Sequence, residues 1–208
     1  MNKITDIFSE NIEKTIESFT LYDYLKKQII TPINLDDLLR SQIVYAVSAF
    51  DKLMHDLIKT GMIQIYMNKR QATPKYLSEP IALETHKKLN DASIPPREII
   101  FEREISKKLK HLSFQEPGRV ADGLSLIWNE NQKWQKIAAE LNTNHDTART
   151  TLKLIVDRRN SIVHESDMDP ITQKKLPISR NDSIDAINYI NHCGLAIARL
   201  VELKENTV

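Results

Sequence analysis

Apolar residues recur at intervals of three and four along most of the chain, and this spacing predicts a succession of helices. The first covers residues 3–19, where the repeat is formed by Ile4, Ile7, Phe8, Ile12, Ile16 and Phe19. Residues 20–30 either continue this helix or form a short second one, which must stop before Thr31-Pro32.

The second predicted helix runs from Leu35 to about Tyr66, with Asn34 and two following aspartates as its N-terminal signal. One apolar stripe extends over many turns: Leu39, Ile43, Ala46, Phe50, Leu53, Leu57 and Gly61. Ser48, Asp51 and His55 lie together on the opposite face, where an ordinary solvated polar surface is one interpretation.

The middle of the chain alternates loops with shorter helices. Residues 68–80 read as a loop because they contain Pro74 and Pro80, and Pro95-Pro96 marks a clear break. The remaining periodic segments predict helices over 81–91, 97–112, 119–128 and 130–141. Trp128, Trp134 and Cys193 are expected to be core residues.

Two helices are predicted in the last third of the chain. The first begins near Asp146 and reaches about His164, and a polar loop follows over 166–181. Asp182 or Ser183 then caps a final helix that runs to about Leu203. With only four glycines and little strand-like alternation, the chain is predicted to be all-α, a bundle of roughly seven to eight helices.

Composition and charge narrow the class of protein. At 24.0 kDa, with 41% hydrophobic residues, the chain suits one soluble domain. A formal net charge of +1 provides no strong global attraction to nucleic acid, so any RNA contact must be local. A single cysteine, a start unlike a signal peptide and no long apolar run favour a cytoplasmic protein without membrane contact.

Arg159 is the anomaly in this pattern. It falls near the middle of an apolar stripe formed by Leu152, Ile155, Val156, Ile162 and Val163, whereas Arg158 is expected to point away from it. Asn160 and His164, four residues apart, share the flank next to Arg159. An arginine on a buried stripe requires a partner, which could be an internal carboxylate, a substrate anion or another subunit.

The spacing of Arg159, Asn160 and His164 is specific enough to carry information. Among ten arginines, 14 asparagines and six histidines in the chain, Arg-Asn followed by three residues and His is expected by chance roughly 0.02 times. The looser pattern, an arginine four to six residues before a histidine, is expected roughly 0.9 times and means nothing alone.

The stretch Arg159-Asn160-Ser161-Ile162-Val163-His164 resembles the Arg-(x)4–6-His motif of the HEPN superfamily. The stretch from Tyr45 to Leu57 resembles the long early helix of the members associated with the RiboL-PSP set. The resemblance implies one HEPN-like α-helical domain over residues 1–208, with the N-terminal helix 3–30 and the insert 68–141 as elaborations. It also implies a bundle that forms a homodimer and, in active members, a metal-independent endoribonuclease.

The motif residues suit RNA cleavage without a metal or cofactor. His164 has the side chain whose ordinary pKa lies nearest neutrality, so it can accept or donate a proton. Arg159 can cover the phosphorane, and Asn160 can orient His164 or donate to a phosphate oxygen. One chain offers one such set, and a two-fold dimer would bring two together in a composite cleft.

Other polar residues could support that site. By the resemblance, the face formed by Ser48, Asp51 and His55 meets the Arg159 and His164 end across the bundle or the dimer. RNA phosphates could also contact a set of basic residues: Arg158, Lys107, Lys108 and Lys110. Nearby glutamates make an ordinary solvated face the competing interpretation of the three lysines.

The motif residues could also have purely structural roles. Arg159 could bridge an internal carboxylate while His164 stabilises the helix C-terminus. Glu165, Asp167 and Asp169 form only a weak metal-binding pattern, and the chain has no zinc spacing, phosphate-binding glycine loop or dinucleotide motif. No metal or cofactor is therefore predicted.

Two functions from different classes remain open. The first is a HEPN-type endoribonuclease that acts as a toxin or phage-defence effector, with a neutralising antitoxin as a partner. The second is a non-catalytic HEPN helical module that binds RNA or a protein partner and uses Arg159 only in the dimer. The intact Arg-Asn-x3-His set favours the first, and the near-neutral charge favours the second.

Overall fold

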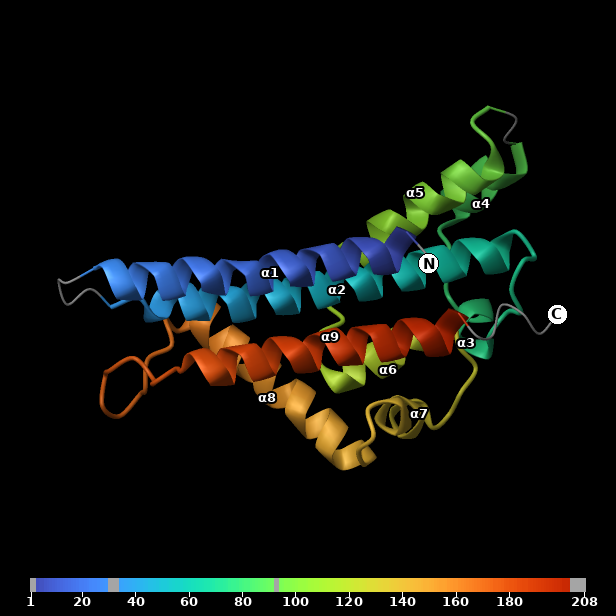
Figure 1. Cartoon of the computed structure of the whole chain (residues 1–208). Helices are drawn as coiled ribbons and strands as arrows, with labels where there is room; N and C mark the ends of the chain where they lie inside the picture. The colour runs from blue at the N-terminus through green and yellow to red at the C-terminus, as the bar shows by residue number, and fades with distance from the viewer. Residues whose placement is uncertain (1–2, 30–33, 92–93, 203–208) are drawn as a thin grey trace.

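The computed structural model describes residues 3–29, 34–91 and 94–202, and within them the chain is all-α, as predicted (Figure 1). The described residues form nine helices: α1 Lys3–Gln28, α2 Asp36–Tyr66, α3 Pro74–Leu77, α4 Leu83–Asp91, α5 Arg97–Leu109, α6 Pro117–Leu124, α7 Lys133–Glu140, α8 His145–His164 and α9 Arg180–Glu202. Their β structure is limited to one isolated bridge between Met168 and Lys175.

Helix α2 is the centre of the bundle. Figure 1 shows α1 running along one side of it and α9 along another, while α8 crosses beneath and α5 leaves the bundle at an angle. The side chains of Phe50, Met54 and Ile58 are completely buried. Burying such a side chain contributes about 1.5–3 kcal/mol, so the buried residues of α2 contribute substantially to the stability of the bundle.

The first two helices follow the predicted pattern. α1 is one continuous helix rather than two, because Phe19 and Tyr22 extend its buried face through residues 20–28. At the start of α2, the side-chain oxygen of Asn34 accepts a hydrogen bond from the amide of Asp36 at 2.7 Å. This bond satisfies one of the helix amides that lack an intrahelical acceptor.

The segment predicted as a loop over 68–80 contains the short helix α3, which is one reason for the larger helix count. Thr73 caps it by accepting a hydrogen bond from the amide of Tyr76 at 3.0 Å, and Pro74 occupies its first turn. Four residues are too few to show a helical repeat, so the prolines alone determined the prediction.

The last helix begins earlier than predicted. Ser179 rather than Asp182 or Ser183 precedes it, and the Ser179 hydroxyl and Asp182 hydrogen-bond each other reciprocally. The Ser179 hydroxyl thereby satisfies the amide of Asp182 in the first turn of α9, while it donates to the Asp182 carboxylate. The predicted end near Leu203 lies outside the described residues.

The predicted core residues Trp128, Trp134 and Cys193 are all buried. Trp134 also donates a hydrogen bond from its indole nitrogen to the carbonyl of Pro117 at 2.9 Å, which ties α7 to the start of α6. Among the described helices, none combines the length and apolar character needed to cross a membrane.

Candidate functional site

The last two turns of α8 carry Arg159, Asn160 and His164, and His164 is the exposed final residue of the helix. Ser166 and Asp167 then take left-handed backbone conformations, with φ of 54° and 58°, which end the helix sharply. The amide of Asp167 closes the turn by donating to the Ser161 carbonyl at 2.9 Å. His164 is therefore presented to solvent at a well-defined helix end.

Arg159 is half-buried, and its contacts differ from those of an ordinary internal arginine. Its Nη1 donates to the side-chain oxygen of Asn160 at 3.0 Å, and its buried Nε has no hydrogen-bond partner among the described residues. Within the same residues no carboxylate forms an ion pair with it, so the internal bridge considered for Arg159 is not observed. Its positive charge remains available to an external anion.

Arg158, rather than Arg159, forms an ion pair with an internal carboxylate. Its Nη2 donates to Oδ2 of Asp167 at 2.8 Å and to the Pro177 carbonyl at 3.0 Å. The prediction that Arg158 points away from the packed face is therefore wrong, because its guanidinium reaches a completely buried carboxylate. We assign Arg158 to the support of the helix end, and its predicted contact with RNA gains no support from this geometry.

Arg40 of α2 completes this cluster, and sequence reasoning missed it. Its Nε donates to Oδ2 of Asp167 at 2.6 Å and its Nη2 to the Leu176 carbonyl at 2.6 Å. The signal was an arginine beside Leu39 in a helix with a long apolar stripe. Two arginines share the Asp167 carboxylate, and Arg40 also forms an ion pair with Asp37 at 3.2 Å, so the carboxylates of this cluster are engaged by Arg40 and Arg158 and not by Arg159.

Asp167, the middle one of the three acidic residues considered as a weak metal-binding pattern, is engaged by arginines. Asp167 is buried, and its Oδ2 accepts hydrogen bonds from Arg40 and Arg158. Asp169 lies in a turn in which its carboxylate accepts hydrogen bonds from the amide and hydroxyl of Thr172 and from the amide of Ile171, and these bonds hold the pKa of Asp169 below its ordinary value. No group of three or more metal-binding side chains occurs in the described part of the chain.

A groove of mixed character lies beside the motif, between α2 and the end of α8. It has a volume of about 370 Å³, and an apolar part formed by Val44, Tyr45, Ile162 and Val163 adjoins a polar part that includes Arg40 and Lys175. Tyr45 is 60% exposed and Val163 is 46% exposed, although both are large apolar side chains. Their exposure next to Arg159 and His164 marks a surface suited to contact with another protein chain.

The predicted supporting face of α2 is engaged elsewhere in the protomer. The carboxylate of Asp51 accepts hydrogen bonds from the amide of Phe114 at 2.7 Å and from the side chain of Gln115 at 3.0 Å. His55 lies 3.2 Å from the Leu112 carbonyl and packs edge-on against Phe114. Asp51 and His55 therefore hold the 112–115 segment against α2.

Ser48 is exposed on α2 in a groove that this helix forms with α1. Within the described part of the protomer, the hydrogen bonds of Asp51 and His55 go to the 112–115 segment and not to Arg159 or His164, and the groove at Ser48 does not include these two residues. A role for this face at the motif would require the second copy of the chain.

The lysines predicted to contact RNA lie on α5 and just after it. Lys108 forms an ion pair with Glu79, while Lys107 and Lys110 are exposed. Helix α5 packs near Met62 of α2, whereas the groove beside the motif reaches Val44. These positions are 18 residues apart, or about 27 Å along a helix, so the lysines are remote from the motif in the protomer.

Comparison with known proteins gives one result. The model of a family described as RiboL-PSP-HEPN matches residues 7–203, nearly the whole chain. No curated protein and no solved structure matches the chain.

Proposed function

The chain belongs to the RiboL-PSP-HEPN family, and from this premise we propose that it is a metal-independent endoribonuclease whose active site is shared by two copies. The observation that carries the proposal is the state of Arg159, a half-buried arginine without a carboxylate partner in the described structure, on the same helix end as exposed His164. A cation held in this way is suited to a phosphodiester.

Each motif residue has a distinct part in the proposed reaction. The guanidinium of Arg159 neutralises the phosphorane oxygens, because its fixed fork of donors matches two of them. Asn160 holds that guanidinium through the 3.0 Å hydrogen bond to its side-chain oxygen, and its amide group remains able to donate to a phosphate oxygen. His164 supplies the proton transfers.

The proposed reaction needs two proton transfers. His164 of one copy accepts the proton of the ribose 2′-hydroxyl while the 2′-oxygen forms a bond to phosphorus. The bond from phosphorus to the 5′-oxygen breaks, and His164 of the second copy donates a proton to that oxygen. The products are a 2′,3′-cyclic phosphate and a 5′-hydroxyl, and no metal or cofactor takes part.

The groove beside the motif supports a homodimer. Exposed Tyr45 and Val163 would be covered by the same surface of a second copy, since a two-fold interface pairs each patch with itself. That contact would bring two Arg159 and His164 sets together. Because uncontrolled RNA cleavage harms a cell, we place the enzyme among toxins or phage-defence effectors in the cytoplasm, with an antitoxin partner that covers this helix end.

The decisive experiment is cleavage of RNA by the purified protein in EDTA, with the product ends identified. We expect cyclic phosphate ends, and we expect His164→Ala to lower the rate about a hundredfold or more. His145→Ala is the matched control, because His145 is partly exposed at the opposite end of the same helix. Full cleavage by His164→Ala would exclude the proposed site. Absence of cleavage by folded dimer would favour a non-catalytic module that binds RNA or a protein.

A further inference from the structure

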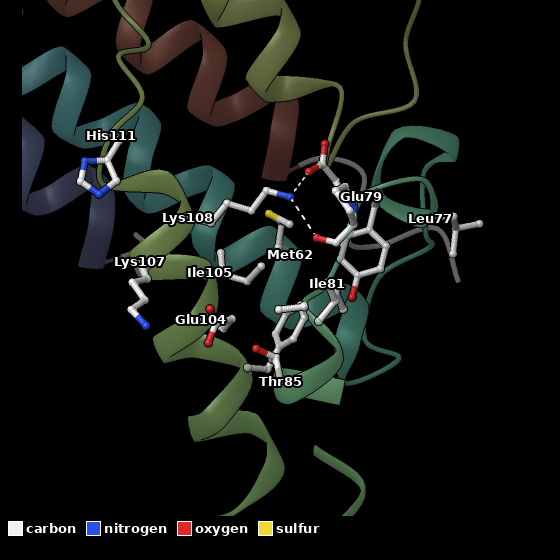
Figure 2. A pocket seen from close by; sticks show the side chains of 14 residues that line it. Met62, Leu77, Glu79, Ile81, Thr85, Glu104, Ile105, Lys107, Lys108 and His111 are labelled. Atoms are coloured by element: carbon white, nitrogen blue, oxygen red, sulfur yellow. Dashed lines mark hydrogen bonds and ion pairs between the residues drawn. The ribbon is translucent and has the colours of Figure 1, made fainter. Parts of the chain in front are cut away.

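A second cavity lies far from the motif, between the C-terminal part of α2 and helices α3 to α5 (Figure 2). It encloses about 560 Å³, within the range of pockets that hold small organic molecules. The buried residues of its lining are Met62, Thr85, Phe101 and Ile105, and they form its inner wall.

Aromatic rings stiffen one wall of the cavity. Phe101 stacks on Tyr66, with ring centroids 4.3 Å apart and an angle of 9° between the rings. Tyr76 lies on another side of Phe101 at 6.5 Å, tilted by 58°. Because each ring is held by its neighbour, this wall is preorganised for an apolar or aromatic ligand and loses little entropy on binding.

The charged side chains that line the cavity are exposed or half-buried. Figure 2 shows Lys108 reaching across the opening, where its ammonium group contacts the Glu79 carboxylate and the Pro80 carbonyl. Glu104, Lys107 and His111 also line the cavity, and Lys107 and His111 are exposed to solvent. The buried part of the lining carries no charge, so a charged ligand group placed there would lose its hydration without a counter-ion beside it.

The polar groups of the aromatic wall and the interior are neutral. Burial raises the pKa of Tyr76, so its phenol keeps its proton, and Thr85 adds a hydroxyl. The rim is apolar, because Leu77 and Ile81 line the cavity although they are 72% and 46% exposed. Isolated apolar residues on a surface are ordinary, but two of them on the rim of an apolar cavity extend its binding surface.

We propose that this cavity is a binding site for an uncharged, mainly apolar small molecule of about two rings, with the Glu79–Lys108 ion pair across its opening. The ligand packs against Phe101 and Tyr76 and makes at most a hydrogen bond with a hydroxyl. The site goes beyond the proposed nuclease, since it lies about 27 Å from the motif groove along α2.

The proposal is tested on the full chain with two fluorescent probes of the same phenyl-naphthylamine body. N-phenylnaphthylamine is uncharged, whereas anilinonaphthalene sulfonate carries an anionic group. We expect saturable binding of the uncharged probe at one site per chain, and binding of the sulfonate weaker by about tenfold or more, because the buried part of the lining offers its charge no counter-ion.

Two variants locate the binding. Ile105→Phe adds volume to the inner wall, and Ala82→Trp adds a large side chain at the exposed edge of the cavity. Each substitution is expected to lower the affinity for the uncharged probe by about tenfold or more. Ser48→Trp is the control, because Ser48 is an exposed residue of the separate groove between α1 and α2. Folding of each variant is checked by circular dichroism.

Four results would overturn the proposal. They are the absence of saturable binding of the uncharged probe to folded wild-type protein, a preference for the sulfonate, wild-type affinity in both folded cavity variants, and a loss of probe binding confined to Ser48→Trp. None of these measurements uses RNA, so the cavity and the nuclease can fail independently.

Discussion

Arg40 and Asp167 are 127 positions apart in the chain, yet the Nε of Arg40 donates to Oδ2 of Asp167 at 2.6 Å in the interior. The side chain of Arg40 is 5% exposed and that of Asp167 is completely buried. Arg158 donates to the same oxygen, so α2, α8 and the loop after α8 are joined at one carboxylate. This junction fixes the helix end that presents Arg159 and His164.

Removing the charge of Asp167 should destabilise the fold. Asp167→Asn removes the buried carboxylate that Arg40 and Arg158 share and leaves buried Arg40 only its contact with exposed Asp37, so we expect a loss of about 3–5 kcal/mol in the free energy of unfolding, measured with urea. Asp37→Asn is the matched control, since Asp37 also contacts Arg40 but is 67% exposed. That change should cost about 1 kcal/mol or less. Equal effects of the two variants would contradict a special role for Asp167.

Val163→Asp should dissociate the proposed homodimer. A buried aspartate on each side of a two-fold contact is unfavourable, so we expect a monomer by light scattering and a loss of RNA cleavage of about a hundredfold or more. Leu154→Asp is the control, because Leu154 is 63% exposed on the same helix but points about 180° away from Val163. A Val163→Asp protein that remained dimeric would exclude this surface as the interface.

Gly194 should be intolerant of a methyl group. A Cβ at this position would lie 2.6 Å from the Phe8 ring and 2.9 Å from a methyl of Leu53, where α9 packs closely on α1 and α2. We expect Gly194→Ala to lower the free energy of unfolding by about 1–3 kcal/mol in urea denaturation.

Gly118→Ala provides the comparison for Gly194. A Cβ at Gly118 meets nothing within 4 Å, and the residue lies in the first turn of α6. The change should therefore be neutral or stabilise the protein by up to about 1 kcal/mol. A destabilisation at Gly118 as large as that at Gly194 would show that the packing contact is not the cause.

Cys193 should make the free energy of unfolding fall as the pH rises above 9. Burial raises the pKa of its thiol from 9.0 to about 12, because the folded protein disfavours the thiolate. The thiol of the unfolded chain loses its proton near pH 9, whereas that of the folded protein keeps it. The contribution of the buried thiol to the free energy of unfolding is therefore complete below pH 9 and is lost as the pH rises toward 12. The slope is about 1.4 kcal/mol per pH unit.

Cys193→Ala isolates this contribution, because the other titrating groups are common to both proteins. Between pH 9 and 11 the unfolding free energy of the wild type should fall relative to that of the variant. The comparison uses the change with pH, since the substitution itself leaves a small cavity in the core. Parallel curves for the two proteins would show that the thiol does not titrate in this way.

Periodicity determined most of the helical content, because an amphipathic helix records its buried face in its own sequence. The long stripe of α2 and the signal at Asn34 are local features of this kind. A helix as short as α3 has no such stripe, and the earlier start of α9 depended on Ser179 rather than on the apolar positions.

The motif itself was also visible in the sequence. Arg159, Asn160 and His164 are close along one helix, so their spacing alone predicted that they share a helix end, and the resemblance to HEPN proteins is matched by the family comparison. Which arginine is anchored internally was not visible, because residues 158 and 159 are adjacent and the partner of Arg158 follows the helix.

Only the tertiary structure decided the contacts between distant parts of the chain. The bond from Arg40 to Asp167, the covering of Asp51 and His55 by the 112–115 segment and the cavity beside Phe101 all depend on how helices pack. A side chain's sequence neighbours specify its face on a helix, whereas its partner across the core is set by the docking of several helices at once. The sequence by itself therefore determined the helices and the motif, and the packing determined which charges are buried, paired or free.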